Sequence, residues 1–471
     1  MLSVSRWSTS WLLGCRALRC APACFKSFSF SKKSEAASSP STVDYPDAAY
    51  ISKNPIVQQL WSARQKAKQR VGRGKDLSVN STLATAPGKP PSASKVSVSY
   101  PFSKDTMLLE TYRNPWGQIR LGRVMEDLDA LAGNVAFFHA DQGQVVEQQP
   151  IIVTASVDRI CLQQAPPPMN LDQQLSGQVT WTGRSSMEIC MKFQAQGSDN
   201  PWLESFVTFV TLDRETHKPI SIPPILPQSK DEQDAYAAGA QRAARKKERR
   251  KQNRAEPLAS AASPATTSAL TAASVDEVAY NLLLEAGPLL NMPSLADPHS
   301  ILMQSTRMQN AMIAQPQVQN LHNRIFGGFL MRRAFELAFA NAYVFGGSRP
   351  IFLEVDEVSF ASPVDVGDLL VFNSCVLYTD DGRLGDFYRT SGKSGSIDDD
   401  DHREHPLVHV EVEAWVTEPE KVSARLSNQF HFTFAITSGK TVRKVLPGNI
   451  DEARRMAIRM EANREQATTC R

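Results

Sequence analysis

The stretch from Asn320 to Phe345 constrains this chain most, because it is apolar on nearly every side of a helix. It reads NLHNRIFGGFLMRRAFELAFANAYVF. Its large apolar side chains cannot be confined to one stripe, so we expect a buried helix that other elements wrap. A membrane span is the alternative, but Arg332, Arg333 and Glu336 argue against it because charges are costly at membrane depth. Glu336 is then either a buried salt-bridge partner or a functional carboxylate.

Length and composition limit the classes of protein that fit. The chain has 471 residues, enough for two or three domains that each bury a core. Its formal net charge of +3 gives no reason to expect nucleic acid as a partner. The 7 cysteines contain no CxxC pair, which argues against structural zinc and against a disulfide framework. We expect free thiols in a reducing compartment.

The N-terminal part of the chain has the composition of a targeting segment. Residues 1–34 contain no Asp or Glu, and basic residues alternate there with Ser, Trp and Leu. This composition is typical of a mitochondrial transit peptide and predicts a location in the mitochondrial matrix; a disordered basic tail is the alternative. Residues 35–99 are rich in Ser, Ala, Pro and Lys, and we expect a mostly disordered extension with one helical island at 56–68. No transmembrane segment is expected.

From about residue 100 the chain becomes periodic, in two parts with the same order of elements. We expect one domain at 100–252, a linker at 253–300 that holds a short helix, and a second domain at 301–471. Each domain should contain a strand, a turn, a long helix, four strands and a closing helix. The first strand is expected at 107–112, and the strands after the long helices at 150–160, 174–181, 187–194, 203–212, 351–360, 369–378, 407–416 and 427–437.

Two charged segments each have two interpretations. The run ARKKERRKQNR ends the closing helix of the first part, and a solvated helix end is favoured over a nucleic-acid patch because no aromatic residues are interleaved. The insert at 391–405 carries four successive Asp residues with His402 and His405, and His409 follows. These side chains could bind a metal, but a solvated loop is favoured. We therefore expect no metal site.

The two parts repeat one another in sequence. At one constant offset, Asn114, Ile119, Gly122 and Met125 match Asn320, Ile325, Gly328 and Met331. At a slightly longer offset, Leu226, Pro227, Asp231 and Glu232 match Leu446, Pro447, Asp451 and Glu452. Two copies of one helix with four or more strands predict a duplicated α+β unit, and the pattern does not indicate a doubly wound parallel sheet.

Several ungapped motifs carry a resemblance to a known family. They are NxxxRIFGGFLMRRAFELA at 320–338, FGGSRP at 345–350, PVDVGDLL at 363–370 and IRLGRVMEDLDALA at 119–132. Together they resemble the mitochondrial double-hotdog acyl-CoA thioesterases over roughly residues 100–460. The resemblance implies two fused hotdog domains, each an antiparallel sheet wrapped around a long central helix, paired as a pseudo-dimer. It also implies hydrolysis of acyl-CoA to a free acid and CoA.

The chemistry of thioester hydrolysis fits the residues at the helix starts. Negative charge develops on the thioester carbonyl, and N–H groups at a helix N-terminus beside glycine can stabilise it. Gly328 and Gly122 hold that position in the two repeats, and a carboxylate must act as general base or nucleophile. Glu336 and Asp129 are the candidates, but each lies about two helical turns, or ~12 Å for Glu336, from its own helix start.

Two helices related by a pseudo-two-fold axis would solve this, since each helix start then lies near the acid of the other. Two composite sites are expected: Asp129 with Asn320 and Gly328, and Glu336 with Asn114 and Gly122. The Asn side chains would hold water or the carbonyl. The acids are offset by one position, because Asp129 aligns with Phe335 and Glu336 with Ala130. The pair Gly327-Gly328 permits closer approach than Leu121-Gly122, which favours the site with Asp129.

Other residues are candidates for supporting roles. Glu126 and Asp127 are alternative acids, with an ordinary solvated helix face as the simpler interpretation. His322 would bind the carbonyl or cap the helix entry. Arg349 would bind a CoA phosphate or pair with Glu354.

The favoured hypothesis is a mitochondrial acyl-CoA thioesterase that needs no metal or redox cofactor and forms a homo-oligomer. A catalytically silent double hotdog that binds acyl-CoA or acts in assembly is the second. Enoyl-CoA hydratase chemistry would require an Asp and a His five residues apart at the helix entry, and that pair is absent from the sequence there.

Overall fold

The computed structural model describes residues 54–71, 87–141, 150–255, 272–319, 324–383 and 404–469, apart from Glu215, Glu357, Ala361, Ser438 and Lys440. All of these residues belong to the unit Pro46–Arg471. The insert at 391–402 and the N-terminal segment 1–34 fall outside the described residues.

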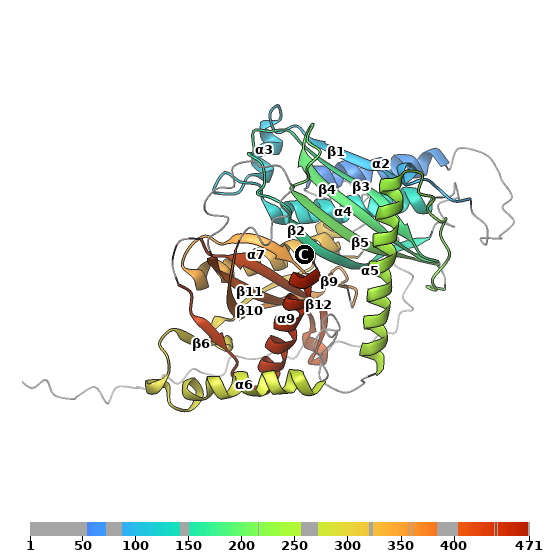
Figure 1. Ribbon diagram of the computed structural model, residues 1–471. Helices are drawn as coiled ribbons and strands as arrows, with labels where there is room; N and C mark the ends of the chain where they lie inside the picture. The colour runs from blue at the N-terminus through green and yellow to red at the C-terminus, as the bar shows by residue number, and fades with distance from the viewer. Residues whose placement is uncertain are drawn as a thin grey trace, which may run out of the picture. The chain divides into compact units, whose positions relative to one another are not determined.

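One long sheet dominates the described part of the chain (Figure 1). Its strands are β1 (Val96–Tyr100), β2 (Ile151–Leu162), β3 (Gln173–Thr182), β4 (Ser186–Ala195), β5 (Leu203–Leu212), β7 (Met308–Ile313), β8 (Ile351–Val355), β9 (Val358–Ser359), β10 (Leu369–Arg383), β11 (Glu404–Glu418) and β12 (Ser423–Ala435). The order is β1-β3-β4-β5-β2-β8-β12-β11-β10-β7, with β9 beside β2, and the pairing is antiparallel throughout. Counted from either edge of the sheet, the equivalent strands of the two repeats therefore follow in the same order. The two sets of strands meet where β2 pairs with β8.

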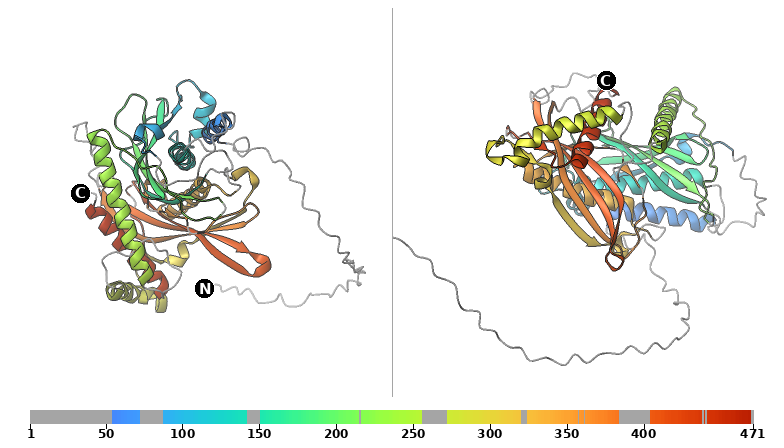
Figure 2. Two further views of the ribbon diagram at one scale, coloured as in Figure 1. Left: turned by 90° about the vertical axis from the view of Figure 1, so that its right-hand side faces the viewer. Right: turned by 90° about the horizontal axis from the view of Figure 1, so that it is seen from below.

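Two long helices lie side by side on one face of the curved sheet (Figure 2). They are α4 (Leu121–Ala140) and α7 (Gly327–Gly346), the two helices that the sequence predicts. Both are buried on most sides because the sheet wraps each of them and the other helix covers the remaining face. Gly347 ends α7 in the left-handed region at φ 62°, where its N–H donates to the Tyr343 carbonyl. The Lys89 ammonium donates to the last carbonyls of α4, those of His139 and Asp141.

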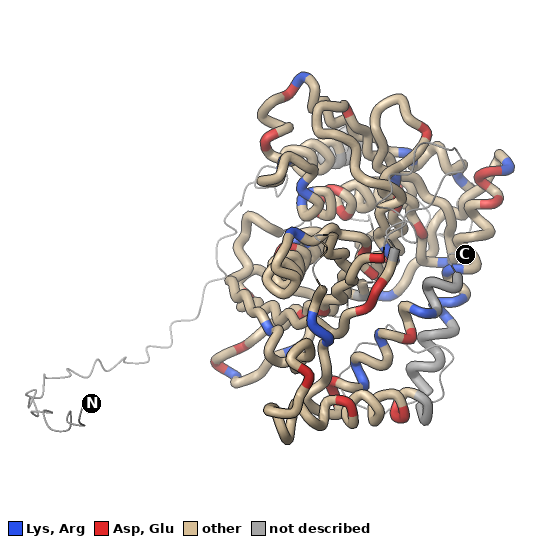
Figure 3. The backbone as a smooth tube through the Cα atoms, turned by 60° about the vertical axis from the view of Figure 1, so that its left-hand side comes forward, with Lys and Arg blue, Asp and Glu red and all other residues tan. Residues whose placement is uncertain are grey.

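The opposite face of the sheet is covered by α5 (Lys230–Ala255) and α9 (Ile450–Thr469), as Figures 1 and 2 show. Charged side chains make this contact: Arg242 of α5 binds Glu188 of β4 through two hydrogen bonds, and Arg455 of α9 binds Glu411 of β11. Side chains alternate along a strand, so these groups point away from the apolar face that packs on the central helices. Acidic and basic residues are interspersed along the described chain in Figure 3.

The remaining elements precede the long helix of each copy, connect the two copies or close the second one. Before α4 come α2 (Pro55–Val71), η2 (Pro91–Ser94) and, after β1, α3 (Thr106–Tyr112). Before α7 come α6 (Ala272–Asn291), η4 (Pro293–Leu295), β6 (Ser300–Leu302), η5 (Met303–Thr306) and η6 (Pro316–Val318). The short helix η8 (Pro419–Lys421) and β13 (Lys444–Leu446), which pairs in parallel with β6, complete the second copy.

The predicted double hotdog is confirmed, with two corrections to the elements. The expected strand at 107–112 is wrong: these residues form α3, because the Asp105 side chain accepts the Leu108 N–H and caps a helical turn there. The expected strand at 351–360 is divided into β8 and β9. The duplication extends to local detail, since the hydroxyls of Ser94 and Thr306 each accept a strand N–H, from Val179 and Val376. Within the described residues, no helix is both long and apolar enough to cross a membrane.

Candidate active site

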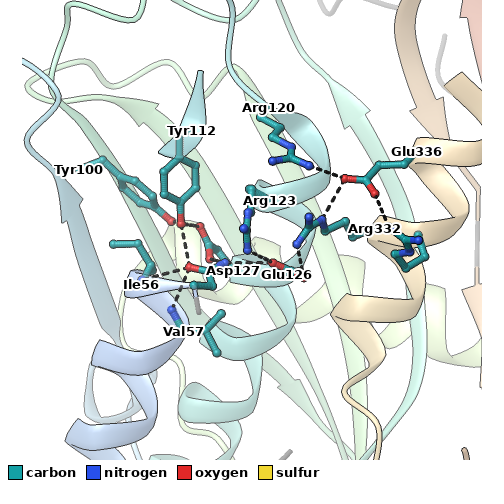
Figure 4. Close-up of polar contacts among 12 residues, drawn as sticks. Ile56, Val57, Tyr100, Tyr112, Arg120, Arg123, Glu126, Asp127, Arg332 and Glu336 are labelled. Atoms are coloured by element: carbon teal, nitrogen blue, oxygen red, sulfur yellow. Dashed lines mark hydrogen bonds and ion pairs between the residues drawn. The ribbon is translucent and has the colours of Figure 1, made fainter. Parts of the chain in front are cut away.

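The central helices α4 and α7 pack antiparallel, so the start of each lies beside the second or third turn of the other. Two ion pairs join their N-terminal halves: Arg332 Nη1 to Glu126 Oε1 at 3.1 Å, and Arg120 Nη2, at the N-cap of α4, to Glu336 Oε1 at 2.7 Å (Figure 4). This is the head-to-tail arrangement that the composite-site prediction requires. Glycines at both helix starts allow the backbones to approach closely.

Asp129 meets the start of the opposite helix. The Gly328 N–H donates to Asp129 Oδ2 at 2.6 Å, across the boundary between the repeats. The carboxylate is buried, and the Thr154 hydroxyl of β2 donates to Oδ1 over a long 3.4 Å. Burial raises the pKa of Asp129 to about 6, and the hydrogen bond from Gly328 opposes that rise. Asp129 therefore titrates close to neutral pH and remains mostly ionised above it.

The two glycines of this helix start are required by close contacts. A Cβ on Gly328 would lie 2.8 Å from the Glu126 Cα, which is backbone and cannot rotate away. A Cβ on Gly327 would lie 3.0 Å from both Asp129 Oδ2 and the Phe360 ring. No acceptor for the Gly327 N–H is found among the described residues. One N–H of the turn is thus bound to Asp129, and the N–H before it has no acceptor in the part of the chain that the structure describes.

The second composite site has diverged. Phe335, which aligns with Asp129, lies against Gly122, with its ring 3.6 Å from the position of a Cβ there. Glu336 accepts hydrogen bonds from Arg120, Arg332 and Arg333. Partial burial would raise the pKa of Glu336, but Arg332 and, to a smaller extent, Arg120 hold it below its ordinary value. An aromatic ring therefore replaces the carboxylate of Asp129, and Glu336 is a permanently ionised member of an ion-pair network.

Of the two predicted Asn residues, Asn114 is among those that the structure describes. Asn114 Oδ1 accepts the N–H groups of Trp116 and Gln118, so its oxygen closes the turn before α4. Its amide nitrogen is left for another partner. Asn320, which aligns with Asn114, and His322 lie outside the described residues.

Arg349 follows the end of α7 and contacts a residue of the first repeat. Its guanidinium sits over the Trp116 ring, 5.6 Å from the centroid, and makes no ion pair with any described residue. The alternative partner, Glu354, instead accepts from Arg159 Nε at 2.6 Å across the seam between β8 and β2. Arg349 is thereby left with donors for an anionic ligand.

Glu126 and Asp127 do not lie on a solvated helix face, so the simpler interpretation of these acids is wrong. Asp127 is fully buried and accepts from Tyr100, Tyr112 and Asn54 at 2.8, 2.5 and 2.8 Å (Figure 4). Burial raises the pKa of Asp127 to about 7, while the Tyr112 and Tyr100 hydroxyls oppose the rise.

Sequence reasoning missed Thr154 and Asn54, because their partners are far away in the chain and neither stands in a motif. His409, proposed with the acidic insert, lies on β11 with its ring stacked on Tyr378, and burial lowers its pKa to about 3. No group of three or more His, Cys, Asp or Glu among the described residues could hold a metal ion.

Comparisons with known proteins place the chain among enzymes that act on acyl-CoA. It is 38% identical over 424 residues to acyl-coenzyme A thioesterase 2, chloroplastic, of Humulus lupulus, covering 87% of this chain and 89% of that protein. It is 39% identical over 423 residues to acyl-coenzyme A thioesterase 4, mitochondrial, of the same plant, covering 87% and 73%. It is 30% identical over 371 residues to mouse acyl-coenzyme A thioesterase 9, mitochondrial, covering 76% and 75%. No protein-family model matches the chain.

Proposed function

This chain belongs to the acyl-CoA thioesterases, and on that premise we propose that it hydrolyses its substrate where Asp129 meets the start of α7. The enzyme is a thioester hydrolase. The observation that carries the assignment of the site is the 2.6 Å hydrogen bond from the Gly328 N–H to Asp129 Oδ2. It joins a carboxylate of one repeat to the helix start of the other, where a thioester carbonyl would be bound.

Asp129 acts as the general base in this proposal. Gly328 fixes Oδ2, so Oδ1, whose bond to Thr154 is long and weak, is the oxygen that accepts a proton from water. A pKa of about 6 suits this role, because the carboxylate is ionised at neutral pH and still basic enough to accept the proton. The resulting hydroxide attacks the thioester carbonyl carbon.

The start of α7 stabilises the charge that this attack creates. The Gly327 N–H points from the first turn of the helix and has no acceptor among the described residues, so we assign it as a donor to the tetrahedral oxyanion. The positive end of the helix dipole adds to the effect. Collapse of the intermediate breaks the C–S bond, and the proton held by Asp129 passes to the departing CoA sulfur. Asn320 would orient the water or the carbonyl.

Direct attack by the Asp129 carboxylate uses the same residue and remains the alternative chemical route. It would form a mixed anhydride that water then cleaves. Label in Asp129 after a single turnover in ¹⁸O-labelled water would establish the anhydride route, and trapping with hydroxylamine detects the anhydride where water cleaves it at the substrate carbonyl. The general-base route places the label only in the acid product, whereas cleavage of the anhydride at the enzyme carbonyl would leave label in Asp129.

The site with Glu336 is non-catalytic in this proposal. Phe335 occupies the place of the base beside Gly122, and three arginines hold Glu336. The second repeat then contributes the helix start and the first repeat the acid. We assign Arg349 to a phosphate of CoA, since its guanidinium has no carboxylate partner among the described residues.

Two further properties are proposed on the basis of composition and relatives. The acid-free, basic segment at 1–34 and relatives named as mitochondrial support import into the mitochondrial matrix. A green-fluorescent-protein fusion of the full chain, followed by protease protection of isolated organelles, tests this. A homo-oligomer is also proposed, and sedimentation velocity measures it.

A thiol reagent that reports free CoA tests the proposed site. Asp129→Asn should lower kcat by about 10²–10⁴-fold with acyl-CoA affinity retained. Glu336→Gln is the matched control and should keep turnover within a few-fold. The alternative, an acyl-CoA binder without turnover, predicts that the unmodified chain binds acyl-CoA but releases no CoA at any chain length. Full activity in Asp129→Asn would remove the site assignment.

A further inference from the structure

We propose that the segment Asn54–Trp61 is part of the catalytic apparatus, with Trp61 as a positioning residue for the helix start that faces Asp129. This rests on the proposed function of that helix start. The segment lies far before the first hotdog strand, in an extension that the sequence predicts to be mostly disordered apart from one helical island at 56–68. The structure instead packs it against both central helices.

Asn54 anchors the segment to α4. Its Oδ1 accepts the N–H groups of Ile56 and Val57 and so caps α2. Its amide nitrogen donates to Asp127 Oδ1 at 2.8 Å and to Glu126 Oε2 at 3.2 Å. Asn54 is buried, and all these partners are charged or backbone groups that would otherwise be costly to bury. The start of α2 therefore has one fixed position on α4.

One face of α2 then runs along α4 toward the active site. The side chains of Ile56, Val57, Leu60 and Trp61 are all buried, at the spacing that places them on one side of a helix. The Asn134 amide donates to the Leu60 carbonyl at 2.7 Å and fixes the helix along its length. Gln59, between them, is exposed.

Trp61 contacts the N-cap residue of α7, whose start faces Asp129. Its ring meets the Phe326 ring edge-on, with centroids 5.4 Å apart and planes at 83°. Phe326 is the N-cap of α7, its carbonyl accepts the N–H groups of Phe329 and Leu330, and its ring lies 2.9 Å from where a Cβ on Gly328 would be. A displacement of Phe326 would thus move the Gly327 and Gly328 N–H groups directly.

Among the described residues, only the start of α7 has such an aromatic contact. In the first repeat the position of Phe326 is taken by Arg120, which pairs with Glu336 instead. Neither α4 nor α7 has a side-chain hydrogen bond at its N-cap, so its orientation depends on such tertiary contacts. The edge-on contact between Trp61 and Phe326 therefore lies at the helix start that faces Asp129. At the helix start that faces Phe335, the equivalent of Phe326 is Arg120, which cannot make such a contact.

The test is steady-state kinetics of three variants of the full chain. Trp61→Ala should lower kcat about 10-fold or more with KM within about 3-fold of its original value, because misplaced N–H groups weaken the transition state more than ground-state binding. Trp61→Phe restores an edge-on aromatic contact and should recover most of kcat. Gln59→Ala, on the exposed face of the same helix, should match the unmodified enzyme.

The outcomes separate positioning from folding. Unchanged kcat in Trp61→Ala overturns the proposal, as does a loss in Trp61→Ala that Trp61→Phe fails to rescue. If Trp61→Ala does not fold, Trp61→Leu keeps an apolar side chain without the ring and is measured in its place. Asp129→Asn distinguishes failure of the proposed active site from failure of the positioning role of Trp61. If Asp129→Asn retains activity, the proposed active site is wrong. If Asp129→Asn is inactive while Trp61→Ala is fully active, only the positioning role is wrong.

Discussion

Arg332 donates a 3.1 Å hydrogen bond to Glu126, although the two residues occupy equivalent positions in the two repeats. Two equivalent positions can touch only where they lie on the pseudo-two-fold axis, so this pair marks that axis. On either side of it stand Asp129 facing Gly328 and Phe335 facing Gly122. The opposite charges of Glu126 and Arg332 also show that the repeats have diverged at this position. Two glutamates or two arginines in contact there would repel each other.

The two helix-start glycines should respond differently to alanine. Gly328→Ala places a Cβ 2.8 Å from the Glu126 Cα, which must displace the helix start, so we expect a loss of about 100-fold or more in kcat/KM. Gly122→Ala meets the flexible Arg332 side chain at 3.2 Å and should keep activity within about 3-fold. CoA release and thermal unfolding of both variants measure this. Equal losses would mean that both helix starts serve the reaction.

The pH dependence of turnover should show the ionisation of Asp129. With a pKa of about 6, kcat/KM should be constant above pH 7 and fall tenfold per pH unit below about 6. Asp127, with a pKa of about 7, faces Asn54, Tyr100 and Tyr112 and not the helix start. A limb near 7 that survives in Asp129→Asn would assign the titration to Asp127 instead.

Asp129→Asn should stabilise the protein at high pH. The pKa of Asp129 is raised on folding from 3.8 to about 6, so its protonated form contributes stability that is fully present below pH 3.8 and is lost as the pH rises through 6. A neutral amide removes the cost of burying the charge, which is at most on the order of 3 kcal/mol. The melting temperature should rise by a few degrees at pH 8 and be unchanged near pH 4. A lower melting temperature at pH 8 would contradict this.

Substitutions of Arg332 and Glu126, the pair on the pseudo-two-fold axis, should have coupled effects on the free energy of unfolding. Arg332→Met leaves Glu126 buried with Arg123 and Asn54 as its remaining partners and should cost about 2–3 kcal/mol in the free energy of unfolding. Adding Glu126→Gln removes the uncompensated charge and should return part of that loss, with a coupling energy of about 1 kcal/mol or more. Urea unfolding of the four proteins of the cycle measures it, and simple additivity would show that the pair contributes nothing specific.

The repeated pattern of the sequence predicted the fold in most of its elements. Helices apolar on every side, such as Phe329–Phe345, can be satisfied only by a wrapping sheet, and the matched residues around Gly122 and Gly328 require the same unit twice. Pairing Asp129 with Gly328 followed from the rise of a helix, because neither acid, Asp129 or Glu336, could reach the start of its own helix. The hydrogen bond between them agrees with that reasoning.

The local sequence pattern gave wrong predictions where a single side chain or a distant partner determines the local structure or the burial of a residue. Met107–Tyr112 looks like a strand, but one capping bond from Asp105 makes it helical. Asp127 and Glu126 look like solvated acids, yet tyrosines at 100 and 112 and an asparagine at 54 surround Asp127.

The sequence by itself thus determined the duplicated scaffold and singled out Asp129 as the candidate acid, because periodicity and repetition can be read from the order of residues alone. Tertiary structure alone decided that three arginines hold Glu336, and that Trp61 braces the helix start opposite Asp129. Those contacts join residues separated by long stretches of chain. Their geometry exists only once two helices have packed antiparallel and placed one repeat's side chains at the other repeat's helix start.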